Sequence, residues 1–391
     1  MRTSAAGYKL AKELADFVRA IDPTRPVTSA VPMVNDDDEP FLEALDVGGY
    51  NYSPTRYLKD HIAYPKRIIV GTESFPDRSF EMWAQYTNNT WVIGDFIWTA
   101  IDYIGESAIG SAATTPDLQV QGQPWQWHIS FCGDIDIMGM QKPQAFYRTV
   151  LWDAADINML VHHPMGITQK EKVSGWGWMD ERDSWNWEGS EGTPLQVRVF
   201  SKCSTQSVPG PNANGTVSLT LDGKPVPGSP MQIGYASEFM ATFMVPYSKG
   251  TLEAKCTNLG AAAPTTTLTT AGASVALKAT ADRSKITPDR DDLSYITVEV
   301  VDASGNRVPD SRERISFSVS SSSVGEIQAV GTGDPTDVSS FQMKERVTFQ
   351  GRAVAILRPS SPTKEGTITL TVKAADNSKI APTTITVQVA E

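Results

Sequence analysis

The sequence predicts an α/β region followed by an all-β region, and two observations carry that prediction. First, short apolar runs near residues 26, 47, 67 and 92 alternate with helical segments, which is the rhythm of a parallel βα sheet. Second, all 10 Trp lie between Trp83 and Trp187, whereas the last 204 residues have no Trp or His and are rich in Thr, Ser and Val. A chain of 391 residues has room for both kinds of domain.

The overall composition narrows the class of protein and its partners. The chain carries 34 Lys and Arg against 45 Asp and Glu, so its formal net charge is -11, and 40% of its residues are apolar. That apolar content is enough for packed cores and excludes a wholly disordered chain. An acidic chain without a Lys/Arg cluster lacks the cations that phosphates attract, so we expect neither nucleic acid nor a membrane as partner. The longest apolar stretch, residues 91–104, contains two Asp, and the first residues show no apolar signal segment.

Four strands are predicted in the first part. A helix over residues 8–20 comes first and ends where Asp22 precedes Pro23, because the residue before Pro is pushed out of the helical region. Four strands after an opening helix indicate the back half of a larger α/β domain. The predicted strands are 26–31, 47–52, 67–71 and 92–99, and the predicted helices beside them are 39–45, 55–64, 79–88 and 143–153.

Polar and aromatic side chains gather at the ends of three of these strands. They are Tyr50, Asn51 and Tyr52 after the second strand, Glu73 after the third, and Trp98 and Asp102 at the fourth. In βα architectures the functional groups collect at the carboxyl ends of the strands. An indole can stack on a sugar ring and a carboxylate can attack or protonate a glycosidic bond, so the pattern indicates a carbohydrate-hydrolysing site. The same pattern also allows a plainer interpretation, in which Glu73 is a solvated loop residue and Trp98 belongs to the core.

From about residue 173 the helical segments stop, and short alternating runs between Gly, Pro and Asn turns take over. Such spacing predicts Ig-like β-sandwiches. The pair Asp222-Gly223 predicts a tight hairpin, since that turn needs positive φ. Residues 260–272 are interpreted as a linker or an edge strand. The predicted strands are 194–200, 217–221 and 240–245 in a first sandwich, and 275–279, 294–301, 315–319, 352–357, 367–372 and 383–389 in a second.

Two residue types need separate comment. Trp176, Trp178, Trp185 and Trp187 open the first sandwich, and we interpret them as packing between the α/β region and the sandwich rather than as a separate sugar platform.

Three Cys cannot define a disulfide framework. Cys203 and Cys256 both fall in the first sandwich and could form a bridge, which would leave Cys132 free, but the sequence leaves this pairing open.

Nearly the whole chain resembles one enzyme family. The stretches are IDPTRPVT (21–28), DVGGYNY (46–52), RYLKDH (56–61), IIVGTES (68–74), GDFIWTAIDYIGES (94–107), CGDIDIMGMQKP (132–143) and WGWMDE (176–181), with DLSYITVEVVDASGNRVP and VGTGDPTD nearer the end. They resemble the β-galactosidases of glycoside hydrolase family 2, in the group with extra C-terminal sandwich domains. The resemblance implies the C-terminal half of a (β/α)8 TIM barrel over residues 1–160 and Ig-like sandwiches over 165–262 and 263–391. It also implies retaining hydrolysis of terminal β-galactosides.

The resemblance further implies roles for particular residues. Glu73 matches the Glu at the end of the seventh barrel strand, which forms a covalent glycosyl-enzyme. Tyr52 best matches the Tyr that hydrogen-bonds to this nucleophile, with Tyr50 as the second choice. Trp98 matches the eighth-strand Trp that walls the sugar pocket. Sugar contacts are also expected among Asn51, Tyr50, Asp102 and His128, and the role of Glu106 is open.

The sequence departs from the family pattern at one essential point. Retaining glycosidases need a second carboxyl group as general acid and base. The family places it in an Asn-Glu pair just before the helix that here spans residues 8–20, yet the chain contains no Asn-Glu pair. Glu39 follows an Asp run and is interpreted as a helix start, not as a replacement acid. We therefore expect a fragment, from a truncated gene model, that lacks barrel strands one to four, is close to inactive alone and exposes apolar faces.

Other functions stay open on the sequence alone. One is another family 2 specificity, β-glucuronidase or β-mannosidase, although residues 1–160 contain no Asn-x-Lys contact for a glucuronic acid carboxylate. Another is a non-catalytic carbohydrate-binding or adhesion module. The expected partner is a β-galactoside or related glycan, with no cofactor and no metal, and a homo-oligomer is an open option. Many such proteins are exported, so a secreted or periplasmic location is compatible with the resemblance, but the sequence does not fix it.

Overall fold

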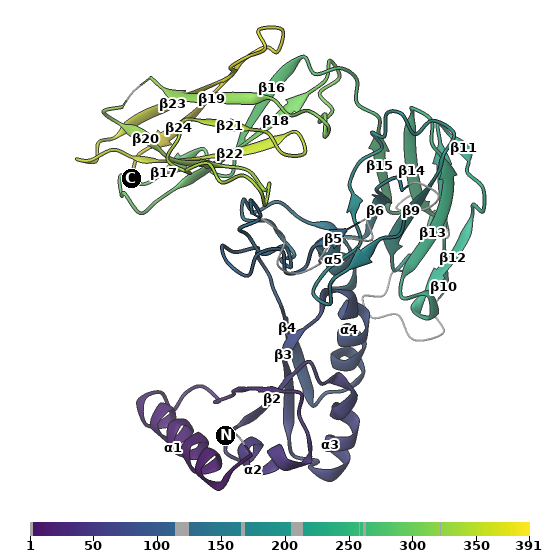
Figure 1. Cartoon of the computed structure of the whole chain (residues 1–391), viewed down its shortest axis with the longest axis vertical. Helices are drawn as coiled ribbons and strands as arrows, with labels where there is room; N and C mark the ends of the chain where they lie inside the picture. The colour runs from purple at the N-terminus through teal and green to yellow at the C-terminus, as the bar shows by residue number, and fades with distance from the viewer. Residues whose placement is uncertain are drawn as a thin grey trace.

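In a computed structural model, the chain forms a parallel sheet with helices and then two β-sandwiches (Figure 1). The structure describes residues 3–113, 125–165, 169–204, 214–257, 259–260, 263–320 and 322–391. Part of the loop expected after the fourth strand, and residues 261–262 of the expected linker, lie outside the described residues.

The first region is built on a four-stranded parallel sheet in the order β1-β2-β3-β4. Strands and helices alternate along the chain as the sequence predicts, and α4 packs against β3 and β4. Strand β3 continues through Ser74, so Glu73 lies inside a strand instead of a loop. The elements are α1 (Ala5–Ile21), β1 (Ala30–Pro32), α2 (Glu39–Leu42), β2 (Val47–Asn51), α3 (Tyr57–Ala63), β3 (Ile68–Ser74), α4 (Ser79–Asn88) and β4 (Val92–Ile97).

Buried side chains hold this sheet to its helices. Tyr50, Tyr57 and Ile69 are completely buried in one apolar cluster. The rings of Tyr50 and Tyr57 meet edge to face with their centroids 5.5 Å apart, an arrangement that aromatic pairs prefer. Gly49 is required in the middle of β2, because a Cβ atom there would lie 2.2 Å from the carbonyl oxygen of Ser29.

Helix α1 turns its apolar side chains to solvent. Phe17 is 64% exposed and Ile21 is 70% exposed, whereas the buried residues of this helix are Gly7, Ala11 and Ala15. Further large apolar side chains are exposed on α1, α3 and β4, namely Leu10, Leu14, Val18, Leu58, Ile62, Ile93 and Phe96. On α1 these side chains recur at helical spacing and share one face, and an exposed apolar face of this kind marks a place where protein contacts form.

Two antiparallel sheets make the first sandwich, one in the order β13-β9-β6-β8 and the other in the order β11-β10-β14-β15, with β12 beside β10. Asp222 and Gly223 join β10 to β11 with φ angles of 49° and 75°, as the predicted hairpin requires. The stretch predicted as linker or edge strand contains β15, which is an edge strand. The strands are β6 (Ile157–His162), β8 (Glu181–Arg182), β9 (Pro194–Ser201), β10 (Asn214–Leu221), β11 (Lys224–Pro225), β12 (Met231–Gly234), β13 (Met240–Pro246), β14 (Thr251–Cys256) and β15 (Thr265–Thr269).

The first sandwich begins before residue 165, where the sequence analysis placed its start. Strand β6 pairs antiparallel with β9, and Met159 lies opposite Val199. This apolar run follows closely after helix α5 (Pro143–Leu151), so its period alone could not separate it from the α/β region.

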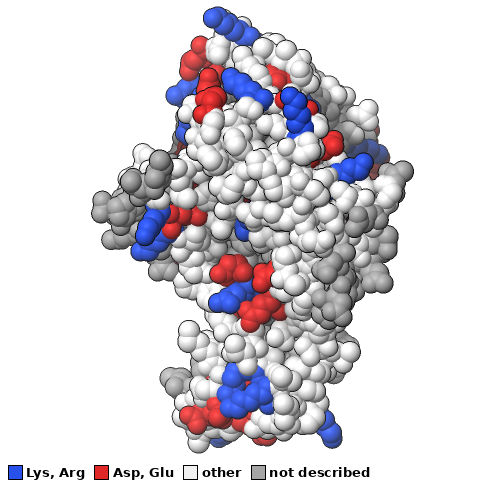
Figure 2. All heavy atoms as spheres, turned by 90° about the vertical axis from the view of Figure 1, so that its right-hand side faces the viewer, with Lys and Arg blue, Asp and Glu red and all other residues white. Residues whose placement is uncertain are grey.

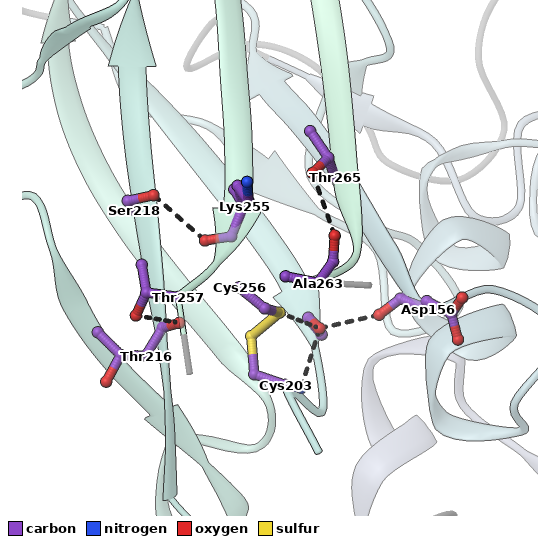
Figure 3. Close-up of a disulfide and its surroundings, with 10 residues drawn as sticks. Asp156, Cys203, Thr216, Ser218, Lys255, Cys256, Thr257, Ala263 and Thr265 are labelled. Atoms are coloured by element: carbon purple, nitrogen blue, oxygen red, sulfur yellow. Dashed lines mark hydrogen bonds between the residues drawn. A yellow bond between two sulfur atoms is a disulfide. The ribbon is translucent and has the colours of Figure 1, made fainter. Parts of the chain in front are cut away.

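A disulfide joins Cys203 to Cys256, with their Cα atoms 5.4 Å apart, and Cys132 is free and buried. Figure 3 shows the bridge between the segment that follows β9 and the end of β14, with Asp156 nearby. The Ser201 hydroxyl accepts a 3.0 Å hydrogen bond from the Cys203 N–H and donates at 2.8 Å to the Asp156 carbonyl oxygen. Since β9 and β14 belong to different sheets, the bridge ties the two layers of the sandwich together.

The second sandwich also has two sheets, in the orders β16-β18-β22-β20 and β17-β24-β23-β19-β21. Its core includes Val298, Phe317, Ala355 and Leu370, which alternate with outward residues along their strands. The strands are β16 (Ala276–Ala281), β17 (Lys285–Ile286), β18 (Ser294–Val301), β19 (Arg314–Val319), β20 (Gly325–Gly331), β21 (Glu345–Val347), β22 (Arg352–Pro359), β23 (Gly366–Ala374) and β24 (Thr383–Val389).

The segment between β4 and α5 contacts the second sandwich. Asp136 accepts backbone hydrogen bonds from Met138 at 2.8 Å and Met140 at 2.9 Å with one carboxylate oxygen. Its other oxygen faces Gly333, where a Cβ atom would lie only 2.0 Å away. A glycine is therefore needed at this contact.

Charged side chains of both signs lie next to one another on the face shown in Figure 2. Ion pairs of the chain include Lys202–Asp153 at 2.7 Å and Arg148–Asp134 at 2.6 Å. Within the described ranges, none of the helices combines the length and the apolar character needed to cross a bilayer.

Candidate active site

The carboxyl ends of β2, β3 and β4 bring Tyr52, Glu73 and Trp98 to one edge of the sheet. Tyr52 directly follows β2, and its backbone N–H donates to the Glu73 carbonyl oxygen at 2.9 Å. Trp98 directly follows β4, and its N–H donates to the Ser74 carbonyl oxygen at 3.0 Å. The three residues expected to form the centre of a sugar site are thus linked through the backbone of neighbouring parallel strands.

A register shift shapes the β2–β3 pairing at this edge. Tyr50 pairs with Gly71, but Asn51 pairs with Glu73, so Thr72 is an additional residue on β3. Such bulges redirect the side chains next to them and are common beside active sites. Tyr52 itself has a φ of 51°, in the left-handed region that residues other than glycine rarely adopt.

The hydroxyl of Tyr52 interacts with two side chains. It accepts a 2.7 Å hydrogen bond from the indole N–H of Trp176, and the Glu73 carboxylate is close enough to act on it electrostatically. Burial is the main cause that raises the pKa of Tyr52 well above its ordinary value, and the Glu73 carboxylate adds to the rise while the Trp176 N–H opposes it. The phenol therefore stays protonated at neutral pH and can donate to the carboxylate.

Aromatic rings surround this hydroxyl. The rings of Tyr52 and Phe75 stack with their centroids 4.3 Å apart. Trp176 meets Tyr52 at 6.3 Å and Phe75 at 5.6 Å, in both cases edge-on. This wall offers the flat apolar surface that sugar-binding sites use beside a few polar groups.

Trp98 and its neighbours form a second side of the edge. Trp98 is half-buried, and its ring lies nearly perpendicular to that of Tyr103 with centroids 6.1 Å apart. The Tyr103 hydroxyl donates to the carboxylate of exposed Glu106. Burial first, and then the bond to Glu106, raise the pKa of Tyr103. Glu106, whose role the sequence left open, therefore accepts a hydrogen bond from Tyr103.

Asn51 and Tyr50 differ in their surroundings. Asn51 is 8% exposed, and its side-chain oxygen accepts a 3.2 Å hydrogen bond from the Thr72 hydroxyl. Tyr50 donates to Asp60 at 2.8 Å and accepts from Arg67 at 3.2 Å. Tyr50 is thus engaged with α3, and the geometry favours Tyr52 as the partner of Glu73.

The sugar contact expected for Asp102 does not fit its environment. The two carboxylate oxygens of Asp102 each accept a 2.9 Å hydrogen bond from the Lys142 ammonium group, and one also accepts from the Gly133 N–H at 2.7 Å. Asp102 is 4% exposed. Burial raises the pKa of Asp102 to about 6 against the opposing effect of Lys142. With both oxygens engaged inside the protein, Asp102 has a structural role.

His128 and Glu39 have partners other than Tyr52 and Glu73. The backbone N–H of His128 donates to the Pro335 carbonyl oxygen at 3.3 Å, and its Nδ1 contacts the Gln126 carbonyl oxygen at 3.2 Å. These contacts place His128 where the segment after β4 meets the second sandwich. Glu39 begins α2 and pairs with Arg67, which agrees with its interpretation as a helix start.

Trp176 is the residue of this site that sequence reasoning missed. We assigned it to packing between regions, but its N–H reaches Tyr52 across 124 residues of sequence. Its place in the WGWMDE stretch was the available signal, and no local pattern connects that stretch to β2. In the part of the chain that the structure describes, no group of three or more His, Cys, Asp or Glu is placed to hold a metal ion.

Comparisons with known proteins point to one enzyme family. The model of the glycoside hydrolase family 2 C-terminal domain 5 matches residues 277–381. The β-galactosidase BoGH2A of Bacteroides ovatus is 24% identical over 408 residues, which cover 93% of this chain and 42% of that protein. A solved structure of a glycosyl hydrolase family 2 member from Bacteroides cellulosilyticus has 32% sequence identity and a TM-score of 0.86, covering 100% of this chain and 48% of that one. The chain is similar to members of glycoside hydrolase family 2 over nearly its whole length, and residues 277–381 match the C-terminal domain 5 of that family.

Other members of family 2 share the fold with lower identity. A solved β-glucuronidase of this family has a TM-score of 0.64 at 18% identity, covering 99% of this chain and 37% of that one. The chain thus spans less than half the length of these relatives. Its one Asn-x-Lys triplet, residues 377–379, lies between β23 and β24 of the second sandwich, far along the chain from Glu73.

Proposed function

We propose that this chain supplies the nucleophile of a retaining β-galactosidase. In this proposal residues 1–160 form the C-terminal half of a (β/α)8 barrel, and the two Ig-like sandwiches (165–262 and 263–391, with β6 added to the first) follow it. The observation that supports it most is the placement of Tyr52 and Glu73 at adjacent strand ends, where the Tyr52 N–H donates to the Glu73 carbonyl oxygen at 2.9 Å and the carboxylate acts electrostatically on the phenol. A protonated phenol beside the carboxylate can orient it by donating a hydrogen bond.

The proposed reaction has two steps. In the first, a Glu73 oxygen attacks the anomeric carbon, the glycosidic C–O bond breaks, and the departing oxygen takes a proton from a general acid. In the second, a water molecule attacks the same carbon, the ester bond to Glu73 breaks, and the conjugate base of the first acid takes the proton of the water. Trp98, Phe75 and Asn51 are the residues proposed to border the sugar.

The general acid of this reaction needs a second carboxyl group about 5–5.5 Å from Glu73. The chain has no Asn-Glu pair, and Asp102 and Glu39 are paired with Lys142 and Arg67. We propose that the acid comes from a part of the barrel that this sequence does not contain. The 391-residue chain alone should then show almost no turnover.

The sugar specificity is proposed from the family relatives. BoGH2A is a β-galactosidase with 24% identity to this chain, and a putative β-glucuronidase of Formosa agariphila has 23% identity, so sequence identity alone does not separate the two sugars. The first 160 residues contain no Asn-x-Lys triplet that could receive a glucuronic acid carboxylate. Galactose is therefore preferred over glucuronic acid.

The test is active-site labelling of the protein with its upstream coding sequence restored. The protein is incubated with 2-deoxy-2-fluoro-galactosyl fluoride, digested, and the labelled peptide is identified by mass spectrometry. We expect the label on Glu73 and no label in Glu73→Gln. Label on another residue, or turnover of aryl β-galactosides without any label on Glu73, would reject the assignment. Preferred turnover of an aryl β-glucuronide would reject the proposed galactose specificity but leave the proposed role of Glu73 as nucleophile intact.

A further inference from the structure

We propose that Trp176 is a positioning residue of the site, which fixes the direction of the Tyr52 proton toward Glu73. This inference rests on the proposed role of Glu73 as nucleophile. The segment that leads into the first sandwich would then take part in the reaction. The sequence indicated only a packing role for it.

The hydrogen atoms available at the Trp176–Tyr52 contact decide which group donates and which accepts. An indole N–H can only donate, and a phenol has one hydrogen and two lone pairs. Trp176 Nε1 lies 2.7 Å from the Tyr52 oxygen, so Tyr52 must accept this bond. The one hydrogen of Tyr52 is then left to turn toward the Glu73 carboxylate, which lies at the neighbouring strand end and acts on the phenol electrostatically. With Trp176 in place, the phenol has a single favourable orientation.

Packing keeps the indole at this contact. Its edge-on contacts with the rings of Tyr52 and Phe75 restrict its rotation. Gly177, the next residue, lets the chain pack closely against Gly110 and Val173, because a Cβ atom there would lie 2.8 Å from both the Gly110 carbonyl oxygen and Val173 Cγ1. The position of the indole is therefore set by its surroundings on several sides.

The segment that carries Trp176 is attached to the loop after β4. Strand β7 (Lys172–Val173) pairs antiparallel with β5 (Ala112–Ala113). The Ser174 N–H donates to the Ser111 carbonyl oxygen at 3.2 Å just before Trp176. The loop that follows Trp98 and the segment with Trp176 thus form one unit at the sheet edge.

A second attachment closes the base of the segment. The carboxylate of Glu171 contacts Nε2 of His162 at 3.1 Å and accepts the Asp180 N–H at 2.6 Å. The N–H of His163 donates to the Asp180 carbonyl oxygen at 2.8 Å. Residues 171 and 180 are both fixed to the end of β6, so Trp176 projects from a loop closed at both ends.

The first test uses a spectroscopic readout that does not require turnover. 3-Fluorotyrosine is incorporated at position 52 of the 391-residue chain, and its ¹⁹F resonance is compared with that of the Trp176→Phe and Trp178→Phe variants. Trp178 is the matched control, because its N–H donates to Glu181 at 2.8 Å instead of Tyr52. We expect a shifted resonance in Trp176→Phe and an unchanged one in Trp178→Phe. An unchanged resonance in Trp176→Phe would overturn the inference.

The second test is a double-mutant cycle in the protein with its upstream sequence restored. If Trp176 acts through Tyr52, then Trp176→Phe lowers kcat about tenfold with little change in KM, since it removes one hydrogen bond. The same substitution should have no effect in a Tyr52→Phe background. Equal losses in both backgrounds would overturn the inference. Absence of label on Glu73 would instead reject the proposed function, and this outcome is read separately by mass spectrometry.

Discussion

The ammonium group of Lys142 lies 2.9 Å from each carboxylate oxygen of Asp102, and both side chains are buried. The ammonium group also donates to the Phe131 carbonyl oxygen at 2.7 Å and lies 3.6 Å from the centre of the Phe131 ring. All three ammonium hydrogens therefore have acceptors. The pair connects the loop after β4 to the start of α5 and holds the backbone from which Trp98 and Tyr103 project.

Breaking this pair on one side should destabilise the protein more than removing it entirely. Lys142→Met leaves the Asp102 carboxylate buried without a cation, and the expected loss is about 3–5 kcal/mol of the free energy of unfolding. In the double variant Asp102→Asn/Lys142→Met much of that loss should be recovered. Urea denaturation monitored by Trp fluorescence measures the free energy of unfolding of the single and the double variant. Equal losses in the two variants would contradict the argument.

The pairing of His162 with Glu171 predicts a pH dependence of stability. Burial lowers the pKa of His162, but the hydrogen bond to Glu171 and its charge outweigh that effect, so the pKa is raised. The same pair lowers the pKa of Glu171 although burial opposes it. Nearby Glu181 favours the imidazolium, and Glu181 is itself paired with Arg198.

The sign follows from these two directions. A raised histidine pKa gives stability that is complete below about pH 6.5 and is lost as the pH rises through the folded-state value. A lowered Glu171 pKa gives stability that is present above about pH 4.5 and is lost as the pH falls through its folded-state value. His162→Gln should therefore cost about 1.5–3 kcal/mol between these limits and much less at alkaline pH. Denaturation series of both proteins at mildly acidic and alkaline pH check this, and a pH-independent difference would contradict it.

Much of the fold could be predicted from the sequence because its signals are local. The strand Ser294–Val301 and the helix Ser79–Asn88 were predicted with the bounds that the structure has, since apolar period and turn residues define them. Strand β6 was missed, because a short apolar run after a helix has no period of its own. The pairing of β6 with β9 is decided by contacts between distant residues.

The candidate site was predictable only in part. Tyr52, Glu73 and Trp98 end successive strands, so the βα pattern was enough to group them. Asp102 was placed in the pocket because it follows Trp98 closely, but its charge is neutralised by Lys142, 40 residues later. The contact of Trp176 with Tyr52 likewise depends on the tertiary fold.

The disulfide should contribute strongly to the first sandwich. Cys203 and Cys256 are 53 residues apart, and closing a loop of this length in the unfolded chain is worth about 2–4 kcal/mol. Cys203→Ala/Cys256→Ala should lower the free energy of unfolding by that amount, whereas Cys132→Ala, at the buried free thiol, retains the bridge. Denaturation with and without a thiol reductant checks the prediction. A parent protein that is insensitive to reductant while its bridge is shown to be reduced would contradict it.

The exposed face of α1 predicts self-association of the chain. Phe17 and Ile21 are more than half exposed, and burying them against a second surface is favourable. Sedimentation velocity should show concentration-dependent association that is weakened by Phe17→Lys/Ile21→Lys. The charge reversal Lys9→Glu/Glu13→Lys, on an exposed polar pair of the same helix, is the control and should leave association unchanged. A monomeric parent chain at all concentrations would contradict the prediction.

The contact between Asp136 and Gly333 has a consequence for sequence variation among relatives. The missing Cβ atom at position 333 leaves the room that the Asp136 carboxylate occupies. Any larger residue at 333 would have to be accompanied by a shorter side chain at 136, or the second sandwich would separate from the loop it rests on. We expect the two positions to change together across homologous sequences, with bulk gained at one only where it is lost at the other.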